Sequence, residues 1–180
     1  FDVEDSHKVL RSAMRRQGPM GKNPYYGTEV KFFLRDIDEE DSTVLKVEFM
    51  SEDMNVLRSY SSDNELKQNK IDLNEGFHTL RWGGGVEGFE LPEGVMPPRG
   101  SQGFIESFSV VPGKYNVKLS YGDYEKISGF EILPDPRNEI DESHFARKSE
   151  LMKDIHDDIS DIYSSLKKMQ SAREQLDDLE

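Results

Sequence analysis

The sequence predicts a mainly β protein with α structure, in which an antiparallel β-sandwich is followed by one long C-terminal amphipathic helix. Two observations carry this prediction. Between residues 28 and 133, about six short segments place apolar residues at every second position, with turn-forming residues between them and no helical pattern. After Asp141 the apolar spacing changes to that of a helix. Short strands without intervening helices are typical of two packed antiparallel sheets.

Each strand is predicted from its alternation. The turn at residues 51–55 leads into the segment 56–60, which predicts a hairpin, and Gly122 and Asp123 connect residues 115–121 to residues 127–133 as a second hairpin. For Gly76–Trp82 the alternation does not decide whether Phe77, Thr79 and Arg81 or His78, Leu80 and Trp82 face the core. The clearest alternating apolar positions are Val30, Phe32, Leu34, Leu45, Val47, Phe49, Tyr115, Val117, Leu119 and Tyr121.

Two segments break the strand pattern. We interpret residues 1–22 as a lead-in segment from a preceding domain, helical or irregular as far as Gln17 and broken by the glycines and proline that follow. The stretch 83–112 is rich in glycine and proline and is predicted to be a loop. These boundaries assign residues 23–134 to the sandwich and residues 135–180 to the helical region.

The helical region carries an apolar seam whose members are spaced alternately three and four residues apart. This spacing is a heptad pattern with apolar residues at both core positions, and Asp141 or Ser143 is suited to cap its start. A single helix cannot bury its own seam, so we expect a second helix, the sandwich or another copy of the chain to cover it. We interpret the region as half of a helical hairpin or coiled coil. The seam residues are Met152, Ile155, Ile159, Ile162, Leu166 and Met169.

Composition excludes several classes of partner. The 180 residues carry a formal net charge of -13, with 36 acidic against 23 basic side chains, so nucleic acid is repelled. The chain has no cysteine, which excludes disulfides and thiolate metal sites. It has no run of about 18 apolar residues, so we expect no membrane insertion.

The sequence contains no catalytic or metal-binding constellation that we can assign. The acidic connection 36–41 is interpreted as a solvated turn because it lacks the glycine and terminal glutamate of a calcium loop. The four histidines lack metal-ligand spacing, and we interpret His156 as a tolerated surface residue beside the seam. Gly83–Gly85 lacks the lysine of a phosphate loop. We therefore expect no catalytic residue, no metal and no cofactor.

Aromatic residues offer one candidate binding site. Tyr25, Tyr26 and Trp82 are the residues we consider for a platform that stacks on the apolar face of a sugar. A core position is the favoured interpretation of Trp82, since a single tryptophan at the end of a strand is usually buried.

Several strings, taken in order, carry a resemblance to a known family. They are 23–28 (NPYYGT), 76–82 (GFHTLRW), 111–119 (VPGKYNVKL) and 134–137 (PDPR). This order resembles the C-terminal region of bacterial sortilin-type, BNR-repeat β-propeller proteins, often labelled glycosyl hydrolases. The second and third strings also look like strands in the immunoglobulin-like domain of the flagellar hook-capping protein. The chain departs from the propeller family at Gly83, where that family more often has aspartate, and at Glu180, where the family usually continues into a second helix.

The resemblance implies an immunoglobulin-like or fibronectin type III-like sandwich that follows a propeller in a secreted, periplasmic or cell-surface bacterial protein. The leading hypothesis is a non-catalytic accessory module that packs against the preceding propeller and pairs through its helix, in this chain as a homodimer. The alternative is a carbohydrate-binding module attached to a glycan-degrading enzyme. A third hypothesis, a hydrolase in its own right, needs a pair of carboxylates across a cleft.

Overall fold

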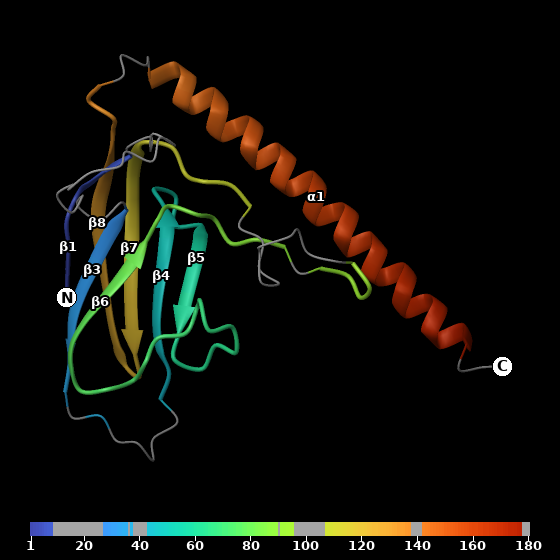
Figure 1. Cartoon of the computed structure of the whole chain (residues 1–180), viewed down its shortest axis with the longest axis horizontal. Helices are drawn as coiled ribbons and strands as arrows, with labels where there is room; N and C mark the ends of the chain where they lie inside the picture. Colours follow the sequence, from blue (N-terminus) through green and yellow to red (C-terminus); the bar gives the residue numbers. More distant parts are fainter. Residues whose placement is uncertain are drawn as a thin grey trace, which may run out of the picture. The chain divides into compact units, whose positions relative to one another are not determined.

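The computed structural model describes residues 1–8, 27–35, 37, 43–89, 91–95, 107–137 and 142–177. In these residues the protein is mainly β, with two sheets and one C-terminal helix (Figure 1). The chain divides into two compact units. The first contains Phe1–Gly84 and Val111–Ile140, and the second contains Gly85–Val110 and Asp141–Glu180. The loop predicted at 83–112 therefore belongs largely with the helix, and not with the predicted sandwich at 23–134.

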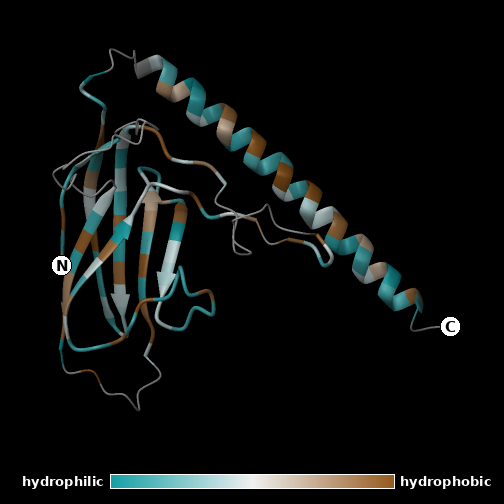
Figure 2. Cartoon of the chain, viewed as in Figure 1, coloured by the Kyte–Doolittle hydropathy of each residue, from teal (hydrophilic) through white to brown (hydrophobic). Residues whose placement is uncertain are grey.

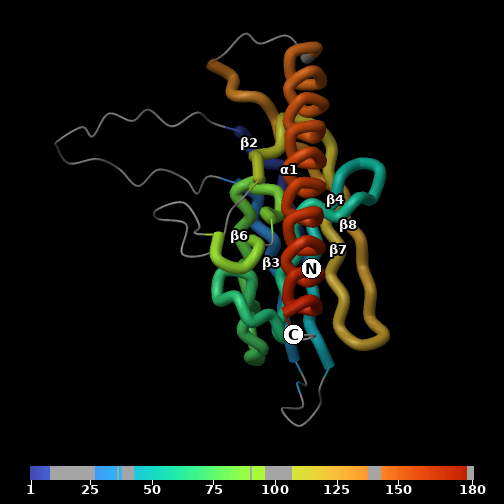
Figure 3. The backbone as a smooth tube through the Cα atoms, turned by 90° about the vertical axis from the view of Figure 1, so that its right-hand side faces the viewer, coloured from blue at the N-terminus to red at the C-terminus, as the bar shows by residue number. Residues whose placement is uncertain are grey.

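The first unit is built from a three-stranded and a five-stranded sheet. The smaller sheet has the order β1 (Asp2–Val3), β3 (Thr28–Leu34), β6 (Gly76–Trp82). The larger sheet has the order β2 (Ser6–Lys8), β8 (Tyr124–Pro134), β7 (Gly113–Tyr121), β4 (Leu45–Ser51), β5 (Val56–Ser61). Both predicted hairpins, β4–β5 and β7–β8, are present as antiparallel pairs. Figure 3 shows the β7–β8 hairpin as a yellow strand that turns and returns in orange.

The first eight residues correct the interpretation of residues 1–22. Instead of a helical or irregular lead-in, they form two short strands that join both sheets. β1 pairs antiparallel with β3, and β2 pairs with β8 in the parallel direction, so the larger sheet is mixed and not purely antiparallel. The alternation that signals a strand is too short to recognise in two- and three-residue elements. The remainder of the lead-in, residues 9–22, lies outside the described residues.

The core lies between the two sheets and is dominated by aromatic rings. Phe49 on β4 stacks on Trp82 of β6, with ring centroids 4.5 Å apart and an interplanar angle of 22°. Phe130 and Tyr115 of the larger sheet pack edge-on against the same Trp82 ring, at 6.2 Å and 6.1 Å. Each such side chain contributes about 2–3 kcal/mol when fully buried. This packing also shows that the His78, Leu80 and Trp82 face of β6 is the inner one, because Phe77 on the other face is 89% exposed.

One glycine is required where β3 and β6 of the smaller sheet begin to pair. Gly27 has φ 120°, and a Cβ atom there would collide with the carbonyl oxygen of Trp82. Few side chains tolerate that backbone conformation, and none fits the space. Gly122, with φ 56°, supplies the left-handed residue of the predicted turn between β7 and β8.

The second unit contains α1 (Glu142–Asp177) and the described parts of the loop at residues 85–110. The helix is uninterrupted, which agrees with the absence of Gly and Pro in the sequence of this segment (Figures 1 and 3). At about 1.5 Å per residue it extends roughly 54 Å. The prediction of a long C-terminal helix is therefore confirmed for residues 142–177.

Candidate functional site: the apolar surface of α1

Two parts of the 85–110 loop lie side by side through a short antiparallel ladder. The backbone N–H of Val86 donates to the carbonyl of Phe108 at 2.8 Å, and the N–H of Ser107 donates to the carbonyl of Val86 at 3.2 Å. Gly85 and Ser109 form an isolated antiparallel bridge beside these bonds. The ladder places Phe108 beside Val86 at the base of the loop.

The loop packs against one side of α1 through His156. The His156 ring lies 4.8 Å from the Phe89 ring and 6.0 Å from the Phe108 ring, and its Nδ1 shares a 2.6 Å hydrogen bond with Ser107 Oγ. Tyr163, two turns further along, packs edge-on against Phe89 at 5.7 Å. The structure corrects the interpretation of His156 as a tolerated surface residue: its side chain is half-buried and contacts three residues of the loop.

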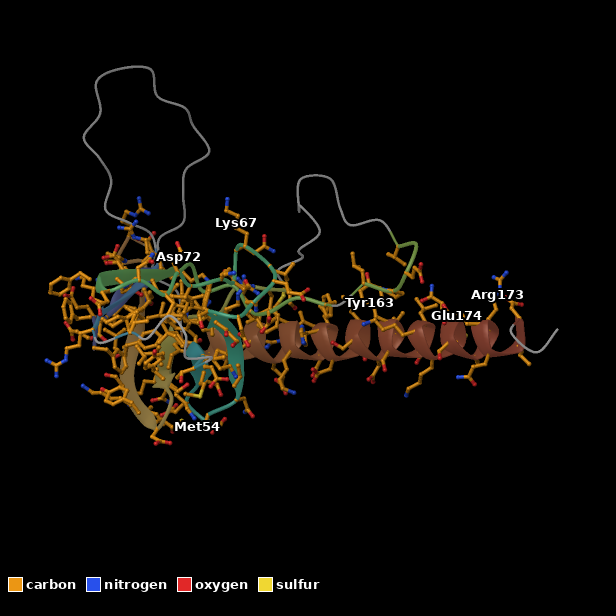
Figure 4. The ribbon with its side chains drawn as sticks, turned by 90° about the horizontal axis from the view of Figure 1, so that it is seen from below. Met54, Lys67, Asp72, Tyr163, Arg173 and Glu174 are labelled. Carbon is orange, nitrogen blue, oxygen red and sulfur yellow. The ribbon has the colours of Figure 1, made fainter. Side chains whose placement is uncertain are left out.

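A third loop contact continues the same line along the helix. Gln170 Nε2 donates a 2.8 Å hydrogen bond to the carbonyl of Glu93. His156, Tyr163 and Gln170 are spaced seven residues apart, so they occupy the same position in three successive heptads. Figure 4 shows Tyr163 on the side of α1 that the loop covers.

The heptad positions explain what the loop leaves open. With Met152, Ile159 and Leu166 at position a, the residues at position d are Ile155, Ile162, Met169 and Leu176, while the loop contacts lie at position e. Met152 and Ile159 are half-buried, but the four d residues are 42% to 66% exposed. We call Ile155, Ile162, Met169 and Leu176 the d stripe. Figure 2 shows apolar residues as brown bands that recur along the helix.

The predicted seam is thus divided between two environments. The loop and the half-buried Met152 and Ile159 lie on one side, whereas the d stripe and Leu166 are exposed within the described residues. The heptad spacing of His156, Tyr163 and Gln170 is present in the sequence, but the seam was predicted from apolar residues alone. The sequence therefore did not predict that the loop covers this side of the helix.

Charges around the stripe are mostly solvated. Lys153 pairs with Asp157 at 2.9 Å on the polar side of the helix, and the hydrogen bond from Lys153 holds the pKa of the Asp157 carboxyl below its usual range. Arg173 lies 3.8 Å from Asp177 and is 84% exposed, so its side chain can turn to another partner. Figure 4 shows Arg173 and Glu174 near the C-terminal end of the helix.

The aromatic platform predicted for sugar binding does not form around Trp82. This side chain is 1% exposed and lies in the core, so neither face of its ring is available to a ligand. Tyr25 and Tyr26 lie outside the described residues. The largest exposed aromatic pair in the described part of the chain is instead Phe33 and Phe77, on the outer face of the smaller sheet, with ring centroids 4.9 Å apart.

Residues 1–8, 27–35, 37, 43–89, 91–95, 107–137 and 142–177 hold no cluster of three or more histidine or acidic side chains that can bind a metal ion. In those same ranges, no helix is both long enough and apolar enough to cross a membrane. The acidic connection 36–41 falls almost entirely on residues that the structure does not describe. Comparisons with protein-family models, with curated proteins and with solved structures gave no match to this chain.

Proposed function

We propose that the chain is a non-catalytic accessory module of a larger secreted bacterial β-propeller protein, in which an immunoglobulin-like body holds position and α1 mediates helix–helix association. The observation that carries the proposal is the d stripe. Four large apolar side chains recur every seven residues on a helix whose neighbouring side is already covered, and water solvates such a surface unfavourably. A surface of this kind is suited to a second helix.

A hydrogen bond from a tyrosine on the second-last strand supports the immunoglobulin-like part of the proposal. In such domains a tyrosine near the start of the second-last strand donates a hydrogen bond to a backbone carbonyl a few residues upstream. Tyr115 lies near the start of β7, the second-last strand of this unit, and its hydroxyl donates to the carbonyl of Val111 at 2.6 Å. The short N-terminal strands that contribute to both sheets agree with the same arrangement.

The preceding propeller, the secreted location and the bacterial origin are supported by the ordered strings at 23–28, 76–82, 111–119 and 134–137. Three of these strings fall wholly or largely on described strands and turns. The helix that follows the last string agrees with the order of elements in the propeller family.

The proposal is tested by the mass of the chain in solution. We expect light scattering over a range of concentrations to show reversible association, and Ile162→Asp to abolish it because the substitution places a charge in the middle of the d stripe. Ser164→Asp is the matched control, since it adds the same charge in the same turn at an exposed site outside the stripe. Circular dichroism verifies that both variants fold.

A strictly monomeric wild-type chain at the highest concentration, with α1 amides that exchange as in an exposed helix, would overturn the proposal. Equal loss of association in Ser164→Asp and Ile162→Asp would also contradict it, because the effect would then follow net charge and not the stripe.

One observation favours the carbohydrate-binding alternative. Phe33 and Phe77 form an exposed aromatic pair on the outer face of the smaller sheet, and the same face carries, four residues further along both strands, the ion pair between Arg81 Nε and Glu29 Oε1 at 2.7 Å. A sugar-binding face combines exposed rings with fixed polar groups. The rings are inclined at 62° and so do not form a flat platform, which is why this function ranks second.

A further inference from the structure

Within the described residues, the two sheets of the first unit have four edge strands, and three of them are protected against pairing with another strand. Open edges pair readily with further strands, so proteins keep them short, irregular or covered. β1 and β2 have only two and three residues. β5 pairs irregularly with β4 at its start, and at its end Asn69 and Ile71 cover it through hydrogen bonds with Ser61 of 2.9 Å and 3.0 Å. The fourth edge strand, β6, differs from all three.

The edge of β6 is long and regular. Its seven residues pair with β3 without a register shift, and its sequence contains no proline and only one charged residue, Arg81. The side chains on its inner face show that the described residues leave this edge uncovered. His78 and Leu80 are only half-buried, whereas Phe32 and Val30, their partners on β3, are 4% and 0% exposed. A further strand can therefore pair with β6 and complete the burial of its inner face.

We infer that the edge of β6 pairs antiparallel with β6 of a second copy of this chain, with the two-fold axis at Thr79. This register keeps all seven residues of both strands paired, since Gly76 then lies opposite Trp82 of the second copy. A shift by two residues in either direction loses two of these pairs. The inference goes beyond the proposed function, because it concerns a different surface and neither contact depends on the other.

The chemistry of β6 favours a second copy as the occupant. An isologous contact requires a surface that is complementary to itself. The register places Arg81 directly opposite Phe77 of the second copy at both ends of the pair, and a guanidinium is attracted to the face of a phenyl ring. Phe77 is 89% exposed and the Arg81 side chain 53%, so both side chains can make this contact while Arg81 keeps its ion pair with Glu29.

The same register suits the other positions of the strand. On the inner face, Leu80 lies opposite His78 of the second copy, so the two half-buried side chains cover each other. On the outer face, Thr79 lies opposite Thr79, a favourable cross-strand pair. A parallel pair in register would instead place Arg81 beside Arg81, and like charges in that position are unfavourable.

This contact is expected to be weak, because paired strands without a shared hydrophobic core are only marginally stable in water. It therefore adds little to the mass of the chain at the concentrations that test the d stripe. Covalent trapping detects it instead, and Ile162→Asp is used as the background so that association through the d stripe does not contribute.

The trapping experiment uses Thr79→Cys, which places one thiol on the two-fold axis of a chain that has no cysteine of its own. Directly opposite residues of an antiparallel pair lie at a distance that a disulfide can span. In a glutathione redox buffer we expect about tenfold more disulfide-linked dimer than from Asp53→Cys, a control at an exposed turn between β4 and β5. Equal yields would overturn the inference and leave the proposed function intact, since the d stripe is disrupted in both proteins.

A charge substitution tests the register. In the Thr79→Cys protein, Phe77→Lys places a lysine opposite Arg81 of the second copy and is expected to lower the dimer yield about tenfold. Phe33→Lys is the matched control, because it adds the same charge to the same face on β3, which is not an edge strand, and should leave the yield within about twofold. Circular dichroism verifies that both variants fold. An equal loss in both would contradict the register.

Amide hydrogen exchange identifies the occupant. We expect the amides of residues 77–81 in the Ile162→Asp protein to exchange more slowly as the protein concentration rises, because pairing with a second copy depends on concentration. Slow exchange of these amides at every concentration would overturn the inference, since another segment of the same chain would then cover the edge.

Discussion

Removing the Tyr115 hydroxyl is expected to change the free energy of unfolding by an amount that depends on pH. Its ring is buried in the core and its hydroxyl donates to the carbonyl of Val111 at 2.6 Å. We expect Tyr115→Phe to lower the free energy of unfolding by about 1 kcal/mol at pH 7, because the variant loses one hydrogen bond and leaves that carbonyl with one partner fewer.

The same residue predicts a loss of stability in alkali. Burial raises the pKa of Tyr115 from 10.0 to about 12, because the phenolate is poorly solvated in the core. The folded chain therefore holds this proton more tightly than the unfolded chain does. The resulting contribution to stability is complete below pH 10 and is lost as the pH rises from about 10 to about 12.

The magnitude follows from the difference between the two pKa values. A rise from 10.0 to about 12 corresponds to at most about 3 kcal/mol. Partial access of water to the hydroxyl end screens the charge, so we expect about 1–2 kcal/mol. The advantage of the wild type over Tyr115→Phe should therefore shrink to zero or reverse by about pH 12.

The assay is urea unfolding of both proteins at pH 7 and at several values between about pH 9 and pH 12. The single tryptophan, Trp82, is buried and reports the loss of the core by its fluorescence. Subtracting the two curves cancels every titrating group that the proteins share. Tyr124→Phe, at an exposed tyrosine, is the control and should cost little at pH 7. A difference between wild type and Tyr115→Phe that stays constant across the range would refute the reasoning.

Two further predictions concern the first unit. Gly27→Ala should lower the free energy of unfolding by about 2–4 kcal/mol in urea titrations, because φ is 120° and a Cβ collides with the carbonyl oxygen of Trp82. Gly83→Ala is the control: it has open space around it and should lower the free energy of unfolding by less than about 1 kcal/mol. Equal costs at both glycines would contradict the steric argument. For the outer face of the smaller sheet, we expect isothermal titration with soluble polysaccharides to show no saturable binding. Saturable binding that Phe77→Ala removes, without loss of stability, would instead support the carbohydrate-binding alternative.

The strands and the helix follow largely from local pattern. Alternation places β3, β4 and β7 almost residue for residue, since a strand half-buried on one face must alternate its side chains. Gly122 and Asp123 indicate the β7–β8 turn because few residues accept the left-handed conformation found there. The heptad spacing after Asp141 predicts α1 for the same kind of reason, as its apolar residues fall on one side only at helical period.

Long-range pairing decided the rest of the protein. No local pattern indicates that β1 and β2 join different sheets or that β2 runs parallel to β8, because the partners are more than 20 and more than 120 residues away. The inner face of β6 is fixed only by the stacking of Trp82 on Phe49 from the other sheet.

The helix shows the same division between local and tertiary information. The sequence by itself determined that α1 carries an apolar seam that needs a cover. Only the tertiary structure shows that the loop covers the His156 side and leaves the d stripe exposed. The physical reason is that periodicity fixes which side chains share a face, whereas the covering of that face depends on segments 48 or more residues distant in the chain.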